Sequence, residues 1–331
     1  MKILVVGHYK KYPSEGMEVI TSAIVNTLQN EFSANVQSRT SREVILGLLE
    51  IKRFQPELVV FTHGPGKGVL VLSRLIHSLV PAASIFWVAS RPTLAKCPTW
   101  LLRYTYVDHI LTGRRYAELM QIEGHRNCGL HDIIIGIDFD RLDICGGDRQ
   151  SSRDRLLGKV ADTSTPLVIH VGHIRHNRGL EQLMEIKKIM GQEVEIVVIG
   201  SPSLTVDQDL LDKMISSGVF VYREYIENLS TYYRCADCYV FPADPQIGGA
   251  VDLPLSVIES LACGTPVISS RFGVLPKVLK KFQGIIFCAH DDIAKTAVKY
   301  LEQQKIPTKV DPIPNAFDLK NVARIIMDIA N

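Results

Sequence analysis

Residues 237–273 read DCYVFPADPQIGGAVDLPLSVIESLACGTPVISSRFG and contain the clearest structural signal of the chain. A short apolar run at 238–241 precedes a glycine-rich loop, and an amphipathic segment follows at 253–262. Gly264 suits the left-handed conformation that commonly ends a helix, and a second apolar run begins at 266–270. This order predicts strand, helix and parallel strand, which is one βαβ unit.

The same alternation of short apolar runs and amphipathic segments extends over the rest of the chain. Apolar runs that predict strands are KILVV, PELVVFTHG, ASIFWV, DHILT, DIIIGI, PLVIHVG, VEIVVIG, VFVYR and QGIIFC. Continuous apolar strands separated by helices are typical of an α/β fold in which helices cover both faces of a parallel sheet.

A polar segment at 145–165 carries no strand signal and divides the alternation into two doubly wound halves. We therefore expect a Rossmann-like domain at 1–155 and a second one at 156–314, facing each other. Residues 315–331 are expected to form a C-terminal helix that packs back on the first domain. A ligand of such sheets lies beyond the carboxyl ends of the strands, so the cleft between the domains is the expected site.

The composition of the 331 residues is that of an ordinary globular protein, with 46% hydrophobic and 22% charged residues. The 37 Lys and Arg nearly balance the 35 Asp and Glu, so no overall field attracts nucleic acid. No apolar run reaches the roughly 18 residues that span a bilayer. Seven cysteines, an odd number, favour reduced thiols and a cytoplasmic location.

Two loops at predicted strand ends suit phosphate binding. In VGHIRHNRG, Gly172 provides the turn, and Arg175 and Arg178 provide guanidinium donors beside a helix start. In GHYKKYPSEG, Gly16 opens a helix whose amides favour an anion. A solvated basic loop and a plain helix cap explain the two stretches equally well. The three histidines at 170, 173 and 176 lack a nearby fourth ligand for zinc, so no metal site is predicted.

Glu259 lies on the predicted helix at 253–262, close to a strand end. A carboxylate in that position suits the paired hydroxyls of a ribose. Spacing alone favours the alternative, a glutamate on the surface of an amphipathic helix.

Motifs in both halves resemble the glycosyltransferases of the GT-B fold, especially the retaining family 4, also called group 1. The family pattern has an "aad" before a strand, a glutamate on the next helix and "CGTPV" after it, and CADCYVF, Glu259 and CGTPV match it. The segments GHIRHNRG, VDHILTGRRYAELM and IIIGIDFDRLDI also resemble family motifs. The resemblance implies two Rossmann-like domains with a cleft between them and transfer of a sugar from a nucleotide.

Some functional residues of that family match positions of this chain. Glu259 matches the glutamate that contacts the nucleotide ribose, and Arg178 matches the basic residue that binds the donor diphosphate. Gly16 matches the glycine near those phosphates. Tyr225 and Ile226 occupy the region where the family holds the nucleotide base.

Three positions depart from the family pattern. Where the family has a glutamate for the transferred sugar, this chain has Val251, and only the adjoining Asp252 could substitute. Leu253 beside it is a further donor-binding candidate. His173 replaces an arginine of the pattern. Ala89-Ser90 replaces a histidine near the reacting sugar, and His63 is the candidate that faces the acceptor, with an ordinary loop histidine as the alternative.

The resemblance implies a metal-independent transferase that acts with retention on an acceptor hydroxyl. Its donor is a UDP-, GDP- or ADP-sugar rather than a bound cofactor, and its acceptor is a glycan, a lipid-linked molecule or a small molecule. Cationic and aromatic residues of the first half are candidates for binding an acceptor that carries a phosphate or for contact with the inner membrane surface, namely Arg74, Arg91, Lys96, Arg103, Arg114, Arg115, Trp87 and Trp100. A solvated surface explains the same charges equally well. The rival hypothesis is a catalytically weak sugar-nucleotide-binding partner or regulator.

Two short motifs are set aside. Asp138-Phe139-Asp140 has the spacing of a metal site in another glycosyltransferase fold, yet Asp207 and Asp209 repeat that spacing inside a predicted helix. Cys235 and Cys238 have redox spacing, but a packed thiol pair is the favoured interpretation.

Overall fold

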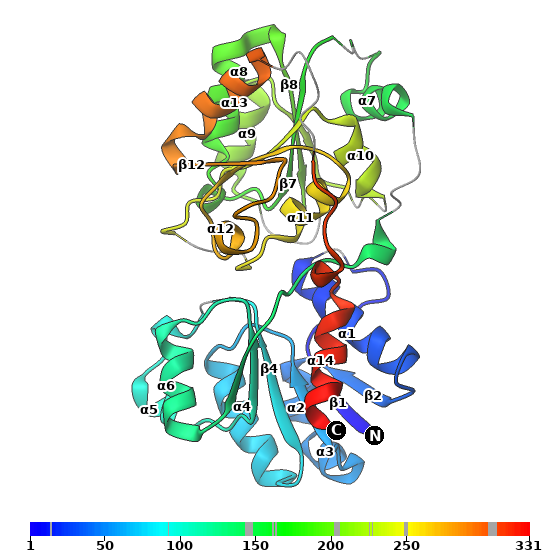
Figure 1. Cartoon of the computed structure of the whole chain (residues 1–331), viewed down its shortest axis with the longest axis vertical. Helices are drawn as coiled ribbons and strands as arrows, with labels where there is room; N and C mark the ends of the chain where they lie inside the picture. The colour runs from blue at the N-terminus through cyan, green and yellow to red at the C-terminus, as the bar shows by residue number, and fades with distance from the viewer. Residues whose placement is uncertain are drawn as a thin grey trace. The chain divides into compact units, whose positions relative to one another are not determined.

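A computed structural model describes most of the chain, and two compact units divide it (Figure 1). Unit 1 comprises Met1–Asp138, Val251–Leu253 and Asn315–Asn331, and unit 2 comprises Phe139–Ala250 and Pro254–Pro314. The described residues are 1–13, 15–91, 93–142, 148–160, 162, 164–201, 206–224, 226, 228–247, 251–303 and 310–331.

Unit 1 is built on a six-stranded sheet in the order β2-β1-β3-β4-β5-β6, in which all pairs of neighbouring strands are parallel. Its strands are β1 (Lys2–Val6), β2 (Asn35–Arg39), β3 (Leu58–Phe61), β4 (Ser84–Ala89), β5 (His109–Thr112) and β6 (Gly129–Asp132). Because all strands run in one direction, the loops after β1, β3, β4 and β5 leave from the same edge of the sheet.

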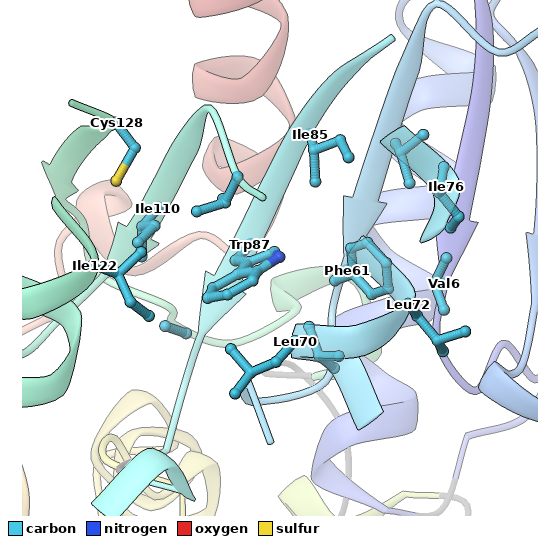
Figure 2. Packing of buried hydrophobic residues seen from close by; sticks show 14 of the residues in the cluster. Val6, Phe61, Leu70, Leu72, Ile76, Ile85, Trp87, Ile110, Ile122 and Cys128 are labelled. Carbon is cyan, nitrogen blue, oxygen red and sulfur yellow. The ribbon is translucent and has the colours of Figure 1, made fainter. Parts of the chain in front are cut away.

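Helices cover this sheet on two faces. Its helices are α1 (Gly16–Asn30), α2 (Ser41–Leu46), α3 (Leu48–Phe54), α4 (Lys67–Leu79), α5 (Thr99–Tyr104), α6 (Ala117–Arg126) and α14 (Lys320–Ala330). Figure 2 shows the core beneath α4 and α6, where Trp87 lies among Phe61, Leu70 and Ile110. Trp87 is fully buried, and its indole donates a hydrogen bond to Ser73 Oγ over 2.9 Å. Trp87 is thus a core residue and not a surface aromatic.

The last helix, α14, packs along α1 within unit 1. The chain reaches it through Phe317, whose carbonyl oxygen accepts a hydrogen bond from the Ile137 amide over 2.8 Å. Arg324 adds two hydrogen bonds of 2.8 Å to the Glu31 carboxylate. The apolar face of α14 buries Val322 and Ile326, so burial of that face holds the helix on the unit.

Two expectations for unit 1 need correction. The run DIIIGI (132–137) predicts a strand, but β6 ends at Asp132. Ile133, Ile135 and Ile137 are buried, and Ile137 pairs with the C-terminal segment through Phe317 and Leu319. Their hydrophobicity therefore reflects burial and not membership of a regular strand. The polar sequence NVQSR forms β2, which carries no apolar signal because it is an edge strand beside β1.

Unit 2 contains a second six-stranded parallel sheet, in the order β12-β11-β10-β7-β8-β9. Its strands are β7 (Leu167–Gly172), β8 (Glu195–Gly200), β9 (Phe220–Tyr222), β10 (Cys238–Phe241), β11 (Val267–Ser270) and β12 (Ile285–Cys288). The helices are α7 (Arg149–Leu157), α8 (Glu181–Met190), α9 (Gln208–Ser216), α10 (Leu229–Cys235), α11 (Leu255–Ala262), α12 (Leu275–Val278) and α13 (Ile293–Gln303). In the described ranges, no helix is long and apolar enough to cross a membrane.

Helix α7 lies within the polar segment 145–165 that was expected to connect the domains, but it is part of unit 2. The boundary between the units therefore falls after Asp138 instead of after residue 155. Arg153 of α7 is 1% exposed. Its guanidinium bonds Asp237 Oδ2 over 2.5 Å and donates to the Cys235 carbonyl over 2.8 Å. A buried arginine with a carboxylate and carbonyl partners anchors the helix where it lies.

Candidate functional site

In unit 2, the loop after β7 meets the loop after β10 at the carboxyl edge of the sheet. Gly179 has φ +67°, and a Cβ there would lie 2.2 Å from the Pro242 carbonyl oxygen. The same oxygen is 2.8 Å from Nδ1 of His290, which follows β12. Only glycine permits this approach, and it places Arg178 beside the ends of three strands.

The charges of Arg178 and Glu259 both act on one buried side chain, Tyr239 of β10. The Tyr239 hydroxyl forms hydrogen bonds with the Val171 carbonyl oxygen over 3.2 Å and with Ser256 Oγ over 2.8 Å. Burial raises the pKa of Tyr239; of the two charged groups, the Glu259 carboxylate raises it further and the Arg178 guanidinium lowers it. The predicted cation and the predicted carboxylate therefore act on one hydroxyl at the carboxyl edge.

Glu259 projects from α11 and is half-buried. The Tyr233 hydroxyl of α10 donates a hydrogen bond to Glu259 Oε2 over 3.2 Å. Tyr233 itself is fully buried, so it holds the carboxylate in one orientation. Gly264, with φ +79°, ends this segment in the left-handed conformation, as predicted.

His170 of β7 is the buried histidine beneath this edge. Burial lowers its pKa to about 4, and the positive charges of Arg178 and His173 act in the same direction. Its Nδ1 lies 2.9 Å from the Val240 carbonyl oxygen, and the neutral ring stacks on Tyr239. His170 thus stays uncharged and supports the loop that carries the cations.

The remaining donor-side candidates occupy the same unit. Gly172 ends β7, and a Cβ there would lie 2.9 Å from His170 Nε2. His173 and Arg175 are half-buried in the loop that leads to Arg178. Ile226 is half-buried between β9 and α10, and Tyr225 lies outside the described residues.

Unit 1 gathers a second group of polar residues at its carboxyl edge. His63 follows β3, and its ring lies 4.7 Å from that of His8, which follows β1. Burial lowers the pKa of His63 to about 4, and the charges of His8 and Arg91 contribute in the same direction. A histidine with so low a pKa is a weak general base at neutral pH, although its ring nitrogens can still form hydrogen bonds.

Asp252 belongs to this unit 1 group, although Glu259, on the next helix, belongs to unit 2. The Asp252 amide donates a hydrogen bond to the Ser90 carbonyl oxygen over 2.8 Å. Asp252 and its neighbour Leu253 are each 5% exposed. Burial raises the pKa of Asp252 to about 6, although Arg114 and Arg91 oppose that shift. Arg114 Nη1 is 3.9 Å from Asp252 Oδ1.

Three buried polar atoms of this unit 1 group have no hydrogen-bond partner among the described residues. They are His63 Nδ1, Arg91 Nε and Asp252 Oδ2. Buried polar atoms in native structures are nearly always paired, so such atoms at a strand-end edge are suited to hydrogen bonds with a ligand. Arg91 was one of several cationic candidates in the sequence, and its grouping with His63 and Asp252 could not be predicted because these residues are far apart in the chain.

Gly16 is the first residue of α1, but acidic side chains already surround that helix start. The Glu15 amide donates to Glu18 Oε2 over 3.3 Å, and Lys10 Nζ lies 2.6 Å from Glu18 Oε1. These carboxylates complement the helix dipole and compete with any phosphate at Gly16.

No group of three or more His, Cys, Asp or Glu within the described ranges is arranged to hold a metal ion. Cys235 and Cys238 are buried and free, and burial raises the pKa of both thiols, so the interpretation as packed thiols is confirmed.

Comparisons with known proteins agree with this architecture. The solved structure of HepE from Anabaena in complex with UDP covers 100% of this chain and 97% of its own, with a TM-score of 0.69 at 13% identity. Sucrose-phosphate synthase from Thermosynechococcus elongatus covers 99% and 94%, with a TM-score of 0.68 at 14% identity. The two parallel sheets with these structural relatives define a protein of the GT-B glycosyltransferase fold.

The sequence comparison indicates a family for the second half of the chain. Residues 156–317 match the model described as Glycosyl transferases group 1. The sulfoquinovosyl transferase SQD2 of Arabidopsis thaliana is 27% identical over 262 residues, covering 71% of this chain and 46% of its own length. A D-inositol 3-phosphate glycosyltransferase of Geodermatophilus obscurus is 30% identical over 155 residues, covering 42% and 32%. The chain thus spans less than half the length of these relatives.

Proposed function

We propose that the chain transfers a sugar from a nucleoside-diphosphate sugar to an acceptor hydroxyl, with retention of configuration and without a metal ion. The observation that carries the proposal lies within the region that matches the family model. There the close approach of Gly179 to the Pro242 carbonyl fixes the loop of Arg178, and the Tyr233 hydroxyl orients Glu259. Solved relatives contain UDP and, in a second HepE structure, UDP-glucose, which makes a UDP-sugar the first donor to test.

In this proposal the unit 2 edge binds the donor nucleotide. Arg178, with Arg175 and His173, balances the negative charge that develops on the diphosphate as the bond to the sugar breaks. Glu259, oriented by Tyr233, accepts hydrogen bonds from the ribose hydroxyls. Residues 225 and 226 adjoin the base, and Gly172 lets the phosphates approach the backbone.

The polar group of unit 1 contacts the sugars in this proposal. Asp252 Oδ2, which is buried without a described partner, accepts a hydrogen bond from a sugar hydroxyl. His63 and Arg91 contact the acceptor, whose identity as glycan, lipid-linked or small molecule the assay below addresses. Gly16 and Leu253 border this group, and we propose that they shape the approach of the donor.

We further propose a cytoplasmic enzyme of glycan biosynthesis. Six cysteines in the described part of the chain are free thiols, which agrees with a reducing compartment.

Donor binding is tested by thermal shift of the purified chain with UDP-, GDP- and ADP-glucose, because a ligand of the native state raises the melting temperature. The preferred donor is then incubated with an acceptor panel, and NMR of the anomeric proton assigns the configuration of the product. Transfer with retention in the presence of EDTA is expected. Donor binding with neither transfer nor donor hydrolysis would instead support a binding partner without catalytic activity.

A further inference from the structure

Unit 1 carries a surface of aromatic and basic side chains on α4, α5 and α6, which the proposed sugar transfer does not use; Trp100, Arg103 and Tyr104 are exposed, and Arg74 and Arg126 are half-buried. We name it the α4–α5 surface, and its residues are Val71, Arg74, Trp100, Arg103, Tyr104 and Arg126. Helix α5 packs against both α4 and α6, so the three helices form one layer.

A cation–π contact and two polar contacts connect these side chains into one patch. The Arg74 guanidinium carbon lies 5.6 Å from the centre of the Tyr104 ring. Arg126 Nη2 donates a hydrogen bond of 2.5 Å to the Arg103 carbonyl oxygen, and Arg103 Nε lies 3.3 Å from His125 Nε2. Trp100 precedes Tyr104 by one helical turn and therefore lies on the same face of α5.

The apolar members of the patch are unusually exposed for their size. Trp100 is 67% exposed, Tyr104 52% and Val71 47%. On the adjacent α2 and α3, which pack against α4, Leu46 and Leu49 are 77% and 74% exposed. Clustered exposure of large apolar side chains marks an interaction surface.

The positive charge of the patch indicates an anionic partner. From Lys67 to Val107 the chain has five Lys or Arg residues and neither Asp nor Glu. Asp108 follows this stretch directly, and its Oδ2 accepts a hydrogen bond from the Ile85 amide over 2.7 Å. Glu118 and Glu123 are the acidic residues of α6. Tryptophan and tyrosine rings favour the boundary between headgroups and acyl chains, and arginines attract anionic headgroups.

We propose that the α4–α5 surface binds peripherally to an anionic lipid bilayer, with Trp100 and Tyr104 in the headgroup region and the arginines on the lipid phosphates. Because vesicle binding is measured without any nucleotide sugar, its failure would leave the proposed transferase activity untouched.

The test uses vesicles of equal parts phosphatidylglycerol and phosphatidylcholine, beside vesicles of phosphatidylcholine alone. The full chain is expected to cosediment with the anionic vesicles only, and less so as salt rises. The two tryptophans provide an internal probe, since Trp87 is fully buried and Trp100 exposed. A blue shift of the emission on binding is expected in the natural chain and not in Trp100→Phe.

Arg103→Glu changes the charge of the surface by two units and is expected to weaken anionic vesicle binding about thirtyfold. Lys281→Glu, an equal change at an exposed site of unit 2, is expected to leave it unchanged. Melting temperatures of both variants report whether they fold. Equal binding to both vesicle types, equal loss in both variants, or binding of RNA or a second copy in place of vesicles would overturn the proposal.

Discussion

The amide of Asp252 donates a hydrogen bond to the carbonyl oxygen of Ser90 over 2.8 Å, which joins residues 162 positions apart in the chain. This bond holds an acidic side chain among the buried polar groups at the carboxyl edge of unit 1. Burial in this position raises the pKa of Asp252, because it penalises the charged form more than Arg114 and Arg91 stabilise it.

Asp252→Asn is expected to stabilise the protein at neutral pH. A folded pKa of about 6, against 3.8 for the ordinary carboxyl, means that the folded state binds more protons between these values. Stability of the natural chain therefore falls as pH rises from 4 to 6, by at most about 3 kcal/mol. The gain in melting temperature from the substitution should be largest above pH 6 and vanish near pH 4. Asp212→Asn, at an exposed site of α9, serves as the control, and an equal effect of the two at pH 7 would contradict the assignment.

Arg178→Ala is expected to lower the turnover of donor at least a hundredfold, since loss of one preorganised donor at a developing charge costs about 2.7–4 kcal/mol. Arg178→Lys should retain part of the activity, because it keeps the charge but loses the planar pair of donors. Steady-state kinetics with the preferred nucleotide sugar measure both. Arg155→Ala, at an exposed site of α7, should turn over normally. Unchanged kcat in Arg178→Ala would rule out the proposed role.

Glu259→Gln should weaken donor binding more than Tyr233→Phe. A hydrogen bond to a charged group contributes about 1.5–3 kcal/mol, so Glu259→Gln should weaken donor binding roughly 10- to 150-fold. Tyr233 acts through Glu259, and loss of its hydroxyl should raise the donor KM only a fewfold while kcat stays near its original value. Donor KM and kcat distinguish the two effects. A stronger defect in Tyr233→Phe than in Glu259→Gln would show that the tyrosine has another role.

Gly179→Ala should be much more damaging than Gly158→Ala, although both glycines have φ near +60°. At Gly158 a Cβ meets nothing within 4 Å, so only the conformational cost of about 1–2 kcal/mol applies. At Gly179 the added atom would collide with the Pro242 carbonyl oxygen and shift the loop that holds Arg178. Thermal unfolding and donor affinity of the pair measure the difference. Similar melting temperatures for the two variants would argue against a close approach of these loops.

Some features were accessible from local patterns. The apolar runs around Leu167 and Cys238 predict parallel strands, and Gly264 predicts the end of α11 as observed. Family motifs extended this to a resemblance to group 1 glycosyltransferases, which the match of residues 156–317 to that family model confirmed. The roles assigned to Arg178 and Glu259 stay predictions, although both residues lie at the predicted edge of their sheet.

Other features could not be predicted from the local sequence. Asn35–Arg39 is polar yet forms a strand, because pairing with β1 provides its backbone partners. The run at 133–137 is apolar yet forms no regular strand, and its last residue, Ile137, pairs instead with the distant segment around Phe317.

Periodicity, glycine positions and motif spacing were sufficient to define two parallel sheets and the candidate donor residues, because these properties depend on neighbours within a few positions. Only the folded chain determined that the charges of Arg178 and Glu259 both act on Tyr239. It also determined that the Asp252 amide donates a hydrogen bond to the Ser90 carbonyl oxygen. Such contacts connect residues that are far apart in the chain, and their burial and pKa values arise from packing that no short stretch encodes.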